Sequence, residues 1–531
     1  MCGESGVPSF VAWVLFVFVA YFAVLIGIAL VRARHMDDLS DYVLGGRRMG
    51  TFTSALSAAS SSSSGWTMLV FPALAFAAGL VHLWTAASIA LGAWLVWTVM
   101  GRRLRRYTVA AGDSLTIPAF LEQRFLDRRG WLRSLAAAIT VFFVVFYVSS
   151  GLIAGAKLLE EVFDISHDEY HWLGILITLV AITTYTFIGG FLAVSRTDVF
   201  QALMMLGGFL LLPLMLIVIA DDPFQGLGGT GEGFWNPFTD DSGEVVGLVF
   251  LLSTAGWGLG TFGSQRVLAR LMAVDREEQI PGSRNIGVSW VVVMFGLGVL
   301  LGMVAVPALR ERGLFDEVAA DPERLFLITA REFFHPLVAG LLLTAVIAAV
   351  MSTADSQLLL ASAIATGDVP LLRRVSSALR SGARVWMGRL MLLAVGAVAA
   401  VLSIYRPDSV FNLVALAWGG MGAAFGPATI LALYWRRFNY WGALTSMLVG
   451  TAVATFWWLL PLGTDASAPL PLLDGVWEAM KADAGGVWTI QPATPGVLLA
   501  VPAAVLVTLL TPPPRREVVE VFDRVTGHAA A

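Results

Sequence analysis

Five consecutive serines interrupt an apolar stretch that is otherwise long enough to cross a bilayer as one helix. Residues 60–64 are all serine, and Gly65 and Trp66 follow them inside an apolar stretch at about 52–79. In hydrocarbon, backbone polar groups must be paired within the protein, so a broken helix is tolerated only where it is packed in protein or lines a watery cavity. Broken membrane helices commonly mark binding sites. The serine run therefore predicts a polar site within the membrane.

A second apolar stretch carries a comparable defect. Its four glycines are Gly256, Gly258, Gly260 and Gly263, and each weakens a helix by roughly 1 kcal/mol relative to alanine. We therefore expect residues 255–263 to break or unwind. Both defects contain a Gly-Trp pair, Gly65-Trp66 and Gly256-Trp257. The alternative is that these small residues serve only close helix packing, but two defects at matched positions favour the break.

Hydroxyls and carboxylates recur in two further apolar stretches. Ser352 and Thr353 are adjacent, and Asp355 lies three residues beyond Ser352, on nearly the same helical face. A carboxylate within a membrane helix is costly and indicates function, unless Asp355 is simply hydrated at the membrane surface. Asp198 is a candidate waypoint for a cation or proton, or else a plain ion-pair partner of Arg196.

The composition is that of an integral membrane protein. Of the 531 residues, 57% are hydrophobic and 14% are charged, and the mean hydropathy is +0.77, far from a soluble domain. The chain has one cysteine, Cys2, so no intramolecular disulfide is expected. No Cys/His cluster, phosphate loop or nucleophile–base pair indicates an enzyme.

About thirteen membrane spans fit this length at ~20 apolar residues each. They are predicted near residues 9–31, 52–79, 81–100, 135–159, 172–188, 191–219, 246–263, 286–309, 334–363, 385–404, 410–434, 442–460 and 496–510. We expect a first helix in 1–35, one unit of spans two to six in 50–220, a second unit of spans seven to eleven in 246–435, two C-terminal spans in 440–511, and a tail in 512–531. The two defects then lie in the first helix of each unit.

Arginines cluster in alternate connections, after spans one, three, nine and eleven. The groups are Arg32, Arg34, Arg47 and Arg48; Arg102, Arg103, Arg105, Arg106, Arg124, Arg128, Arg129 and Arg133; Arg373, Arg374, Arg380 and Arg384; and Arg436 and Arg437. The positive-inside rule makes these loops cytoplasmic, with the N terminus outside and the tail inside. Arg310, Arg312 and Arg324 are exceptions. Spans two and seven would start on opposite sides, so the two units would be inverted.

Several segments in this order resemble the sodium:solute symporter family, most closely its bacterial sodium/proline symporters. They are residues 41–47, 55–58 leading to 64–66, 185–195, 256–260, 348–353 and 422–427. The resemblance implies an all-α integral membrane protein with a LeuT-type fold, about 13 transmembrane helices and a 5+5 inverted repeat. It also implies sodium-coupled secondary active uptake of a small solute, with L-proline the first candidate, in the cell (inner) membrane.

The same resemblance implies site residues. Sodium would be held by the carbonyls of Ser60, Ser63 and Ala349 and the hydroxyls of Ser352 and Thr353. Solute contacts would fall near Ser64, Gly65, Trp66, Tyr147, Trp257 and Thr261. Independently of the resemblance, Asp198 and Asp355 are candidate coupling carboxylates, because a carboxylate within a membrane helix is costly and indicates function. No other cofactor and no nucleic acid is expected, and the oligomeric state stays open.

The chain departs from the proline symporters at three positions. Ser62 stands where they carry an aspartate, and Thr261 and Gln265 replace their tyrosine and proline. Asp355 is a candidate source of the missing charge. Two alternatives follow: a proton-coupled amino-acid or carboxylate carrier on the same scaffold, and a transporter-like nutrient sensor, which would need an output domain or a partner recruited by the tail.

Overall fold

The computed structural model describes residues 6–33, 44–219, 233–240, 243–405, 409–459 and 489–527. Across these ranges the regular structure is helical, and the only β-type contacts are two isolated bridges, Met49 with Val274 and Thr239 with Val245. The motif at 41–43 lies outside the described residues. The predicted all-α class is confirmed.

The helices follow the predicted spans closely. The longer ones are α1 (Gly6–Ala33), α3 (Thr51–Ser62), α4 (Phe71–Ala78), α5 (Leu83–Leu95), α6 (Gly101–Ala110), α7 (Ile117–Phe125), α8 (Trp131–Phe163), α9 (His167–Ile219), α10 (Leu248–Gly260), α11 (Gln265–Ala273), α12 (Ile280–Glu311), α14 (Leu325–Phe333), α15 (Pro336–Asp368), α16 (Pro370–Ala378), α17 (Ser381–Tyr405), α18 (Val410–Tyr434), α19 (Tyr440–Leu459), α21 (Ala493–Leu510) and α22 (Arg516–Thr526). Short turns include η1 (Gly45–Arg47), η2 (Trp66–Val70), η3 (Gly79–His82), η4 (Val96–Met100), η6 (Thr261–Gly263), η7 (Glu277–Gln279), α13 (Phe315–Ala320) and η8 (Pro322–Arg324).

Ten helical stretches of the described chain are long and apolar enough to cross a membrane. Two of them each cover more than one predicted span: residues 66–110 hold the end of the second span and the third, and α9 holds the fifth and sixth. The seventh span is divided and contributes a shorter apolar helix, Leu248–Gly263. All thirteen predicted apolar stretches are therefore occupied by helix.

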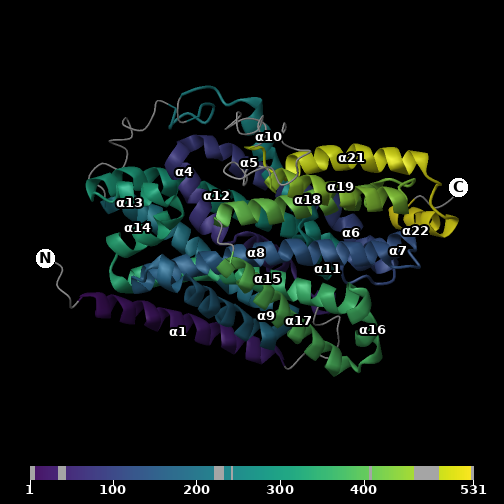
Figure 1. Cartoon of the computed structure of the whole chain (residues 1–531), viewed down its shortest axis with the longest axis horizontal. Coiled ribbons are helices and arrows are strands. Elements are labelled where there is room, and N and C mark those ends of the chain that lie inside the picture. The colour runs from purple at the N-terminus through teal and green to yellow at the C-terminus, as the bar shows by residue number, and fades with distance from the viewer. Residues whose placement is uncertain are drawn as a thin grey trace.

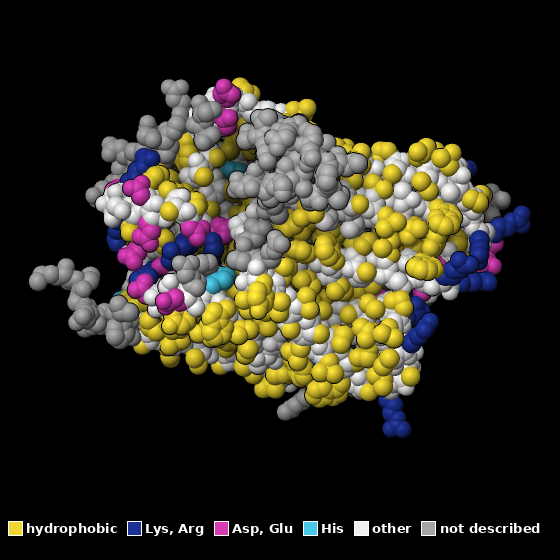
Figure 2. All heavy atoms as spheres, viewed as in Figure 1, with side chains coloured by type: hydrophobic (Ala, Val, Ile, Leu, Met, Phe, Trp, Pro, Cys, Tyr) yellow, Lys and Arg dark blue, Asp and Glu magenta, His cyan; other side chains and the backbone are white. Residues whose placement is uncertain are grey.

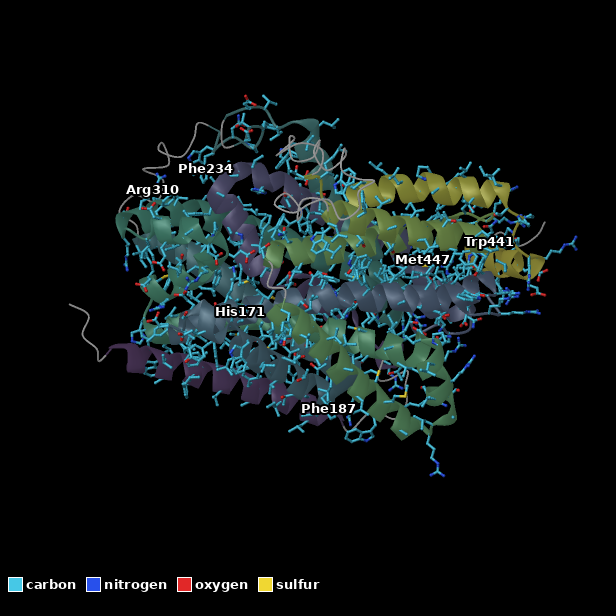
Figure 3. The ribbon with its side chains drawn as sticks, in the orientation of Figure 1. His171, Phe187, Phe234, Arg310, Trp441 and Met447 are labelled. Carbon is cyan, nitrogen blue, oxygen red and sulfur yellow. The ribbon has the colours of Figure 1, made fainter. Side chains whose placement is uncertain are left out.

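The long helix α9 reverses direction at Gly190. This glycine has φ 61° and ψ −171°, a conformation far from helical that a side chain would disfavour. Tyr185 donates to the Met351 carbonyl at 3.4 Å, and Gln201 donates to the Tyr21 hydroxyl, which itself lies 3.9 Å from the Met351 sulfur. Both residues therefore lie near Met351, although sixteen positions of straight helix would place them about 24 Å apart. Figure 3 shows the first half running from His171 toward Phe187, in the direction of the right-hand end. The predicted boundary between spans five and six, 188–191, is confirmed.

The spans lie side by side along the long axis of the molecule (Figure 1). α1 begins at the left-hand end, whereas α6, α7, α16 and α22 lie at the right-hand end. Figure 2 shows hydrophobic side chains over the middle of this face and most charged side chains toward the two ends. Large apolar residues are exposed on the outer helices, including Val218 at 79% and Leu510 at 76%, an arrangement that suits lipid and not water.

Both predicted interruptions exist, at slightly different places from those expected. The first helix ends at Ser62, Ser63 leaves helical geometry with φ −93° and ψ 87°, and a wide turn, η2, resumes at Trp66. In the second, the four-glycine segment stays helical, and the chain leaves helical geometry at Ser264, with ψ 97°. The prediction of unwinding from 255 onward was therefore wrong for Gly256, Gly258 and Gly260.

Those three glycines serve close packing instead. A Cβ on Gly258 would collide with the Ser88 backbone, and one on Gly260 would collide with the Trp418 ring. The Gly258 amide also donates to the Ser88 hydroxyl at 3.2 Å. The glycines let α10 approach α5 and α18 more closely than any larger residue allows, and this approach brings the second break to the centre of the bundle.

Candidate functional site

Two hydroxyls of α15 meet the broken end of α3. Ser352 Oγ lies 3.3 Å from the Ser60 carbonyl and 3.1 Å from the Ala349 carbonyl. Thr353 Oγ1 donates to the Ser61 carbonyl at 3.0 Å. These groups can meet because α3 ends at Ser62, so no further turn of helix covers its last carbonyls. The result is a buried cluster of neutral oxygens.

Four of the five predicted sodium ligands belong to this cluster: Ser60, Ala349, Ser352 and Thr353. The fifth, Ser63, is buried beside it, and its amide bonds the Ser60 carbonyl at 2.9 Å. The Ser63 hydroxyl turns back to the Ala59 carbonyl. The Ser61 carbonyl, which the sequence did not single out, takes the contact with Thr353. The Ser60 hydroxyl has no hydrogen-bond partner among the described residues.

The two Gly-Trp pairs meet across the bundle. The rings of Trp66 and Trp257 lie 4.4 Å apart between centroids, at 30°. Gly65 lets the first break lie close against α8 and α15, because a Cβ there would lie 2.7 Å from Ala154 and 3.2 Å from Val350. The Tyr147 hydroxyl donates to Ser64 Oγ at 3.4 Å. Five predicted solute contacts, Ser64, Gly65, Trp66, Tyr147 and Trp257, are therefore brought together.

The sixth predicted contact, Thr261, lines a small cavity beside them. The cavity holds about 30 Å³ and is lined by Ala58, Ala59, Ser62, Ile89, Ala93, Trp97, Thr261, Val267, Gly287, Val291 and Trp418. Such a volume suits about one water molecule and falls far short of a pocket for a small ligand. Thr261 Oγ1 has no hydrogen-bond partner in the described chain. Ser64, Trp66, Tyr147 and Trp257 are themselves buried, so in this arrangement these side chains pack on one another.

Asp198 is fully buried and forms an ion pair with Arg270 of α11. Its Oδ2 lies 3.1 Å from Arg270 Nη2 and 2.5 Å from the Ser57 hydroxyl. Arg270 also donates to Ser57 at 3.1 Å and to Ser356 at 2.6 Å. The expected alternative partner, Arg196, is not the partner of Asp198, because the side chain turns inward to α3 and α11. One buried network thus joins α3, α9, α11 and α15.

Asp355 lies in the same buried region. Its side chain accepts a hydrogen bond from the Tyr185 hydroxyl, and its other oxygen has no partner in the described chain. The alternative that Asp355 is hydrated at the membrane surface was wrong, since the residue has no exposed surface. Tyr185 belongs to the first half of α9 and Asp198 to the second, so the reversal at Gly190 places both beside α15.

Sequence reasoning missed two side chains at this site, Arg266 and Trp418. Arg266 Nη2 donates to the Tyr147 hydroxyl at 3.0 Å, and Trp418 donates to the Trp257 carbonyl at 2.8 Å. A signal for Arg266 was available: Arg266 and Arg270 stand one helical turn apart just after the predicted break. Trp418 gave no such signal, because an aromatic residue in an apolar helix is ordinary core.

A helical membrane bundle with two helices broken at one buried polar centre is the architecture of a secondary transporter. The sodium:solute symporter family matches residues 42–450. The chain belongs to that family, and the family makes it a transporter and not an enzyme.

Characterised relatives match over nearly their whole length. The osmoregulated proline transporter OpuE of Bacillus subtilis is 34% identical over 509 residues, covering 94% of this chain and 96% of that protein. A sodium/proline symporter of Haemophilus influenzae is 34% identical, covering 97% of each chain. The sodium/proline symporter of Escherichia coli is 36% identical over 448 residues, covering 83% of this chain and 87% of that protein.

Among solved structures, a sodium-coupled sialic acid symporter in a substrate-bound, outward-open state has the same fold. Its TM-score is 0.73 at 18% identity, and the match covers 95% of this chain and 99% of that one. The predicted LeuT-type fold is confirmed.

Proposed function

We propose that this protein takes up L-proline or a closely related small amino acid together with sodium, by alternating access. The observation that carries the proposal is the contact between the broken end of α3 and the hydroxyls of α15, Ser352 to Ser60 and Thr353 to Ser61. A hard cation prefers several oxygen ligands, and carbonyls at a helix break supply them to sodium in transporters of this architecture.

The proposed sodium ligands are the carbonyls of Ser60, Ser63 and Ala349 and the hydroxyls of Ser352 and Thr353. The cluster carries no formal charge. On arrival, sodium would take the oxygens that now bond each other, and Ser352 and Thr353 would turn their lone pairs toward the ion. The bond that ties α15 to α3 would then run through the cation, so sodium occupancy would stabilise one relative placement of these helices.

The proposed solute site adjoins this cluster. Trp66 and Trp257, now packed on each other, would part to offer apolar faces to a small ring. The start of η2, where the Trp66 and Thr67 amides now bond Ser64, would present the positive end of a helix dipole to the solute. Proline is named by the relatives, sodium/proline symporters among them. Thr261 and Gln265 differ from the proline symporters, so the panel of solutes tested must extend beyond proline.

The driving force is sufficient for concentrative uptake. One positive charge moved through about 100 mV contributes ~2.3 kcal/mol, and a tenfold sodium gradient adds ~1.4 kcal/mol. Together they support roughly several-hundredfold accumulation for one coupled ion.

We further propose two inverted repeats, 50–220 and 246–435, with the N terminus outside and the C-terminal tail in the cytoplasm. Trp66 and Trp257 would then hold equivalent positions in the two repeats, and the contact between their rings supports this pairing. The arginine-bearing elements α6, α7, α16 and α22 share one end of the molecule (Figure 1), as expected of a cytoplasmic face. The inner cell membrane is the proposed location.

Uptake of labelled proline into proteoliposomes tests the proposal. We expect saturable uptake with sodium outside and little with potassium. A panel of proline analogues and short carboxylates, run as competitors, identifies the preferred solute. Uptake that is indifferent to sodium would contradict the proposed coupling.

Proton coupling is a second candidate, favoured by the two buried carboxylates and the neutral Ser62. Asp198 and Asp355 both lie in the network beside α15. A proton carrier needs a carboxylate that changes its charge during the cycle. Uptake driven by an imposed pH gradient in sodium-free buffer would select this candidate, and its loss in Asp355→Asn would assign the carboxylate.

A further inference from the structure

We propose that Arg266 binds the carboxylate group of the transported solute. The inference rests on the proposed function and deepens it, because it names the group that recognises one chemical feature of the solute. Arg266 lies on α11, directly after the second helix break, and has no exposed surface.

The guanidinium of Arg266 is held against the predicted solute site. Its carbon lies 4.3 Å from the centroid of the Tyr147 ring and 5.2 Å from that of Trp418. Nη2 donates to the Tyr147 hydroxyl at 3.0 Å, and that hydroxyl in turn reaches Ser64 at 3.4 Å. Trp418 and the next residue on α11, Val267, both line the small cavity with Thr261. Arg266 therefore borders the place where the solute is expected.

This arginine has no anionic partner among the described residues. No carboxylate of the described chain lies within 4 Å of it, and its Nε and Nη1 have no hydrogen-bond acceptor there. Arg270, one turn later on the same helix, makes the contrast: it pairs with Asp198 and also bonds Ser57 and Ser356. The two arginines are both buried, but Arg270 has a carboxylate partner and Arg266 has none among the described residues.

A buried guanidinium stays charged and is costly without a counter-ion. Stacking on Tyr147 and Trp418 offsets part of that cost. Its planar fork of donors matches a carboxylate with two parallel hydrogen bonds. The unused Nη1 and the second N–H of Nη2, whose first N–H bonds Tyr147, supply such a fork. A solute carboxylate would neutralise the charge during transport.

Ligand-induced thermal stabilisation of the purified full chain in lipid nanodiscs tests this assignment, because a ligand that binds the folded state raises its melting temperature. Three probes are titrated in sodium: L-proline; L-prolinamide, which lacks the carboxylate; and cyclopentanecarboxylate, which lacks the amine. Each titration yields an apparent Kd.

In the wild type we expect prolinamide to bind about 30- to 4,000-fold more weakly than proline, the range for truncating one partner of a buried charged pair. In Arg266→Gln the two apparent Kd values should differ by no more than about fivefold, because the variant has lost the guanidinium that binds the carboxylate. Arg266→Lys keeps the charge without the fork and gives an intermediate ratio.

Arg124→Gln is the matched control. Arg124 is also fully buried, with Nη1 and Nη2 unpartnered in the described chain and with its guanidinium over aromatic rings, but it lies on α7, away from the site. This variant keeps the wild-type ratio. If Arg266→Gln does not fold, Arg266→Lys tests the inference in its place: an affinity ratio below that of the wild type supports carboxylate binding by Arg266, and an unchanged ratio contradicts it.

The outcomes separate the inference from the proposed function. An unchanged proline-to-prolinamide ratio in the Arg266 variants, with sodium-dependent proline uptake intact, overturns the inference alone. Binding of cyclopentanecarboxylate but not proline, lost in Arg266→Gln, overturns proline as the solute and supports the inference. A wild type that binds neither carboxylate overturns the inference.

Discussion

Ser352 and Thr353 place two hydroxyls against the carbonyls of a broken helix, and this contact is the basis of the proposed sodium site. We expect Ser352→Ala to raise the sodium concentration for half-maximal proline uptake about tenfold or more, since a hydrogen-bond partner of a charged group contributes ~1.5–3 kcal/mol. The measurement is sodium-dependent uptake at fixed proline.

Ser362→Ala is the control for that variant. Ser362 is fully buried on the same helix, and its hydroxyl bonds the Leu359 carbonyl one turn back, as Ser352 bonds Ala349. It keeps the wild-type sodium dependence. Equal shifts in both variants would show a general loss of helix packing and not a lost ligand.

Asp198 is the only carboxylate of the described chain that pairs with Arg270. Asp198→Asn should lower the melting temperature markedly, because breaking a buried ion pair from one side costs about 3–5 kcal/mol. The double variant with Arg270→Gln should regain part of the loss, since no unpaired charge remains. If Asp198→Asn keeps the wild-type melting temperature, the ion pair does not stabilise the fold.

Close contact between α10 and α18 brings the second break to the centre. A Cβ on Gly422 of α18 would lie 2.5 Å from Gly260 Cα and 3.2 Å from the Leu259 carbonyl, all rigid backbone. Gly422→Ala should therefore lower the stability of the folded protein by ~1–3 kcal/mol through overpacking, and so lower its melting temperature, despite the better helix propensity of alanine. Gly296→Ala is the matched control, because nothing lies within 4 Å of a Cβ there, and its melting temperature should not fall.

The sequence predicted the elements better than the contacts between them. Polar residues inside apolar stretches located the first break to within a residue or two, because lipid tolerates so few of them. The second break was placed too early: glycine content measures helix propensity, whereas Gly256, Gly258 and Gly260 are held in helix by their neighbours. Propensity is overruled where tertiary packing requires a small residue.

The sequence alone could not predict which residues pair with the buried charges. Asp198 and Arg196 are close along the chain, but Asp198 pairs with Arg270, seventy-two positions later. That pairing depends on how α9 and α11 cross. The reversal at Gly190 likewise determines that Tyr185 reaches Asp355, from a different span. A resemblance to a family supplied the proposed sodium ligands, whereas the lack of an anionic partner for Arg266 became visible only in the packed structure.

Both ends of α8 are tethered by ion pairs. At the end nearest α7, Arg133 bonds Glu122 at 2.6 Å and Asp368 at 2.5 Å. At the other end, Lys157 bonds Asp321 at 2.9 Å and Glu323 at 2.8 Å. The predicted solute contacts between these two ends, among them Trp66, Tyr147 and Trp257, are buried. Under the proposed alternating access, one set of these pairs would open at a time.

Access to the centre should therefore depend on sodium. In a Cys2→Ser background the chain has no other cysteine, and Ser62→Cys places a thiol on the cavity wall. We expect a membrane-impermeant thiol reagent added outside to modify Ser62→Cys several-fold faster in sodium than in potassium, and proline to slow the reaction. Ala29→Cys, in the fully buried packing of α1, serves as the unreactive control. Equal rates in both salts would contradict sodium-stabilised opening.

The central claim is that sodium and the solute occupy one buried centre where two broken helices meet, and therefore move together. Simultaneous flux of radiolabelled sodium and labelled proline into proteoliposomes tests it most directly. We predict that proline accelerates sodium entry in a fixed ratio and that Ser352→Ala reduces both fluxes together. Proline accumulation without any accompanying sodium flux would contradict the account.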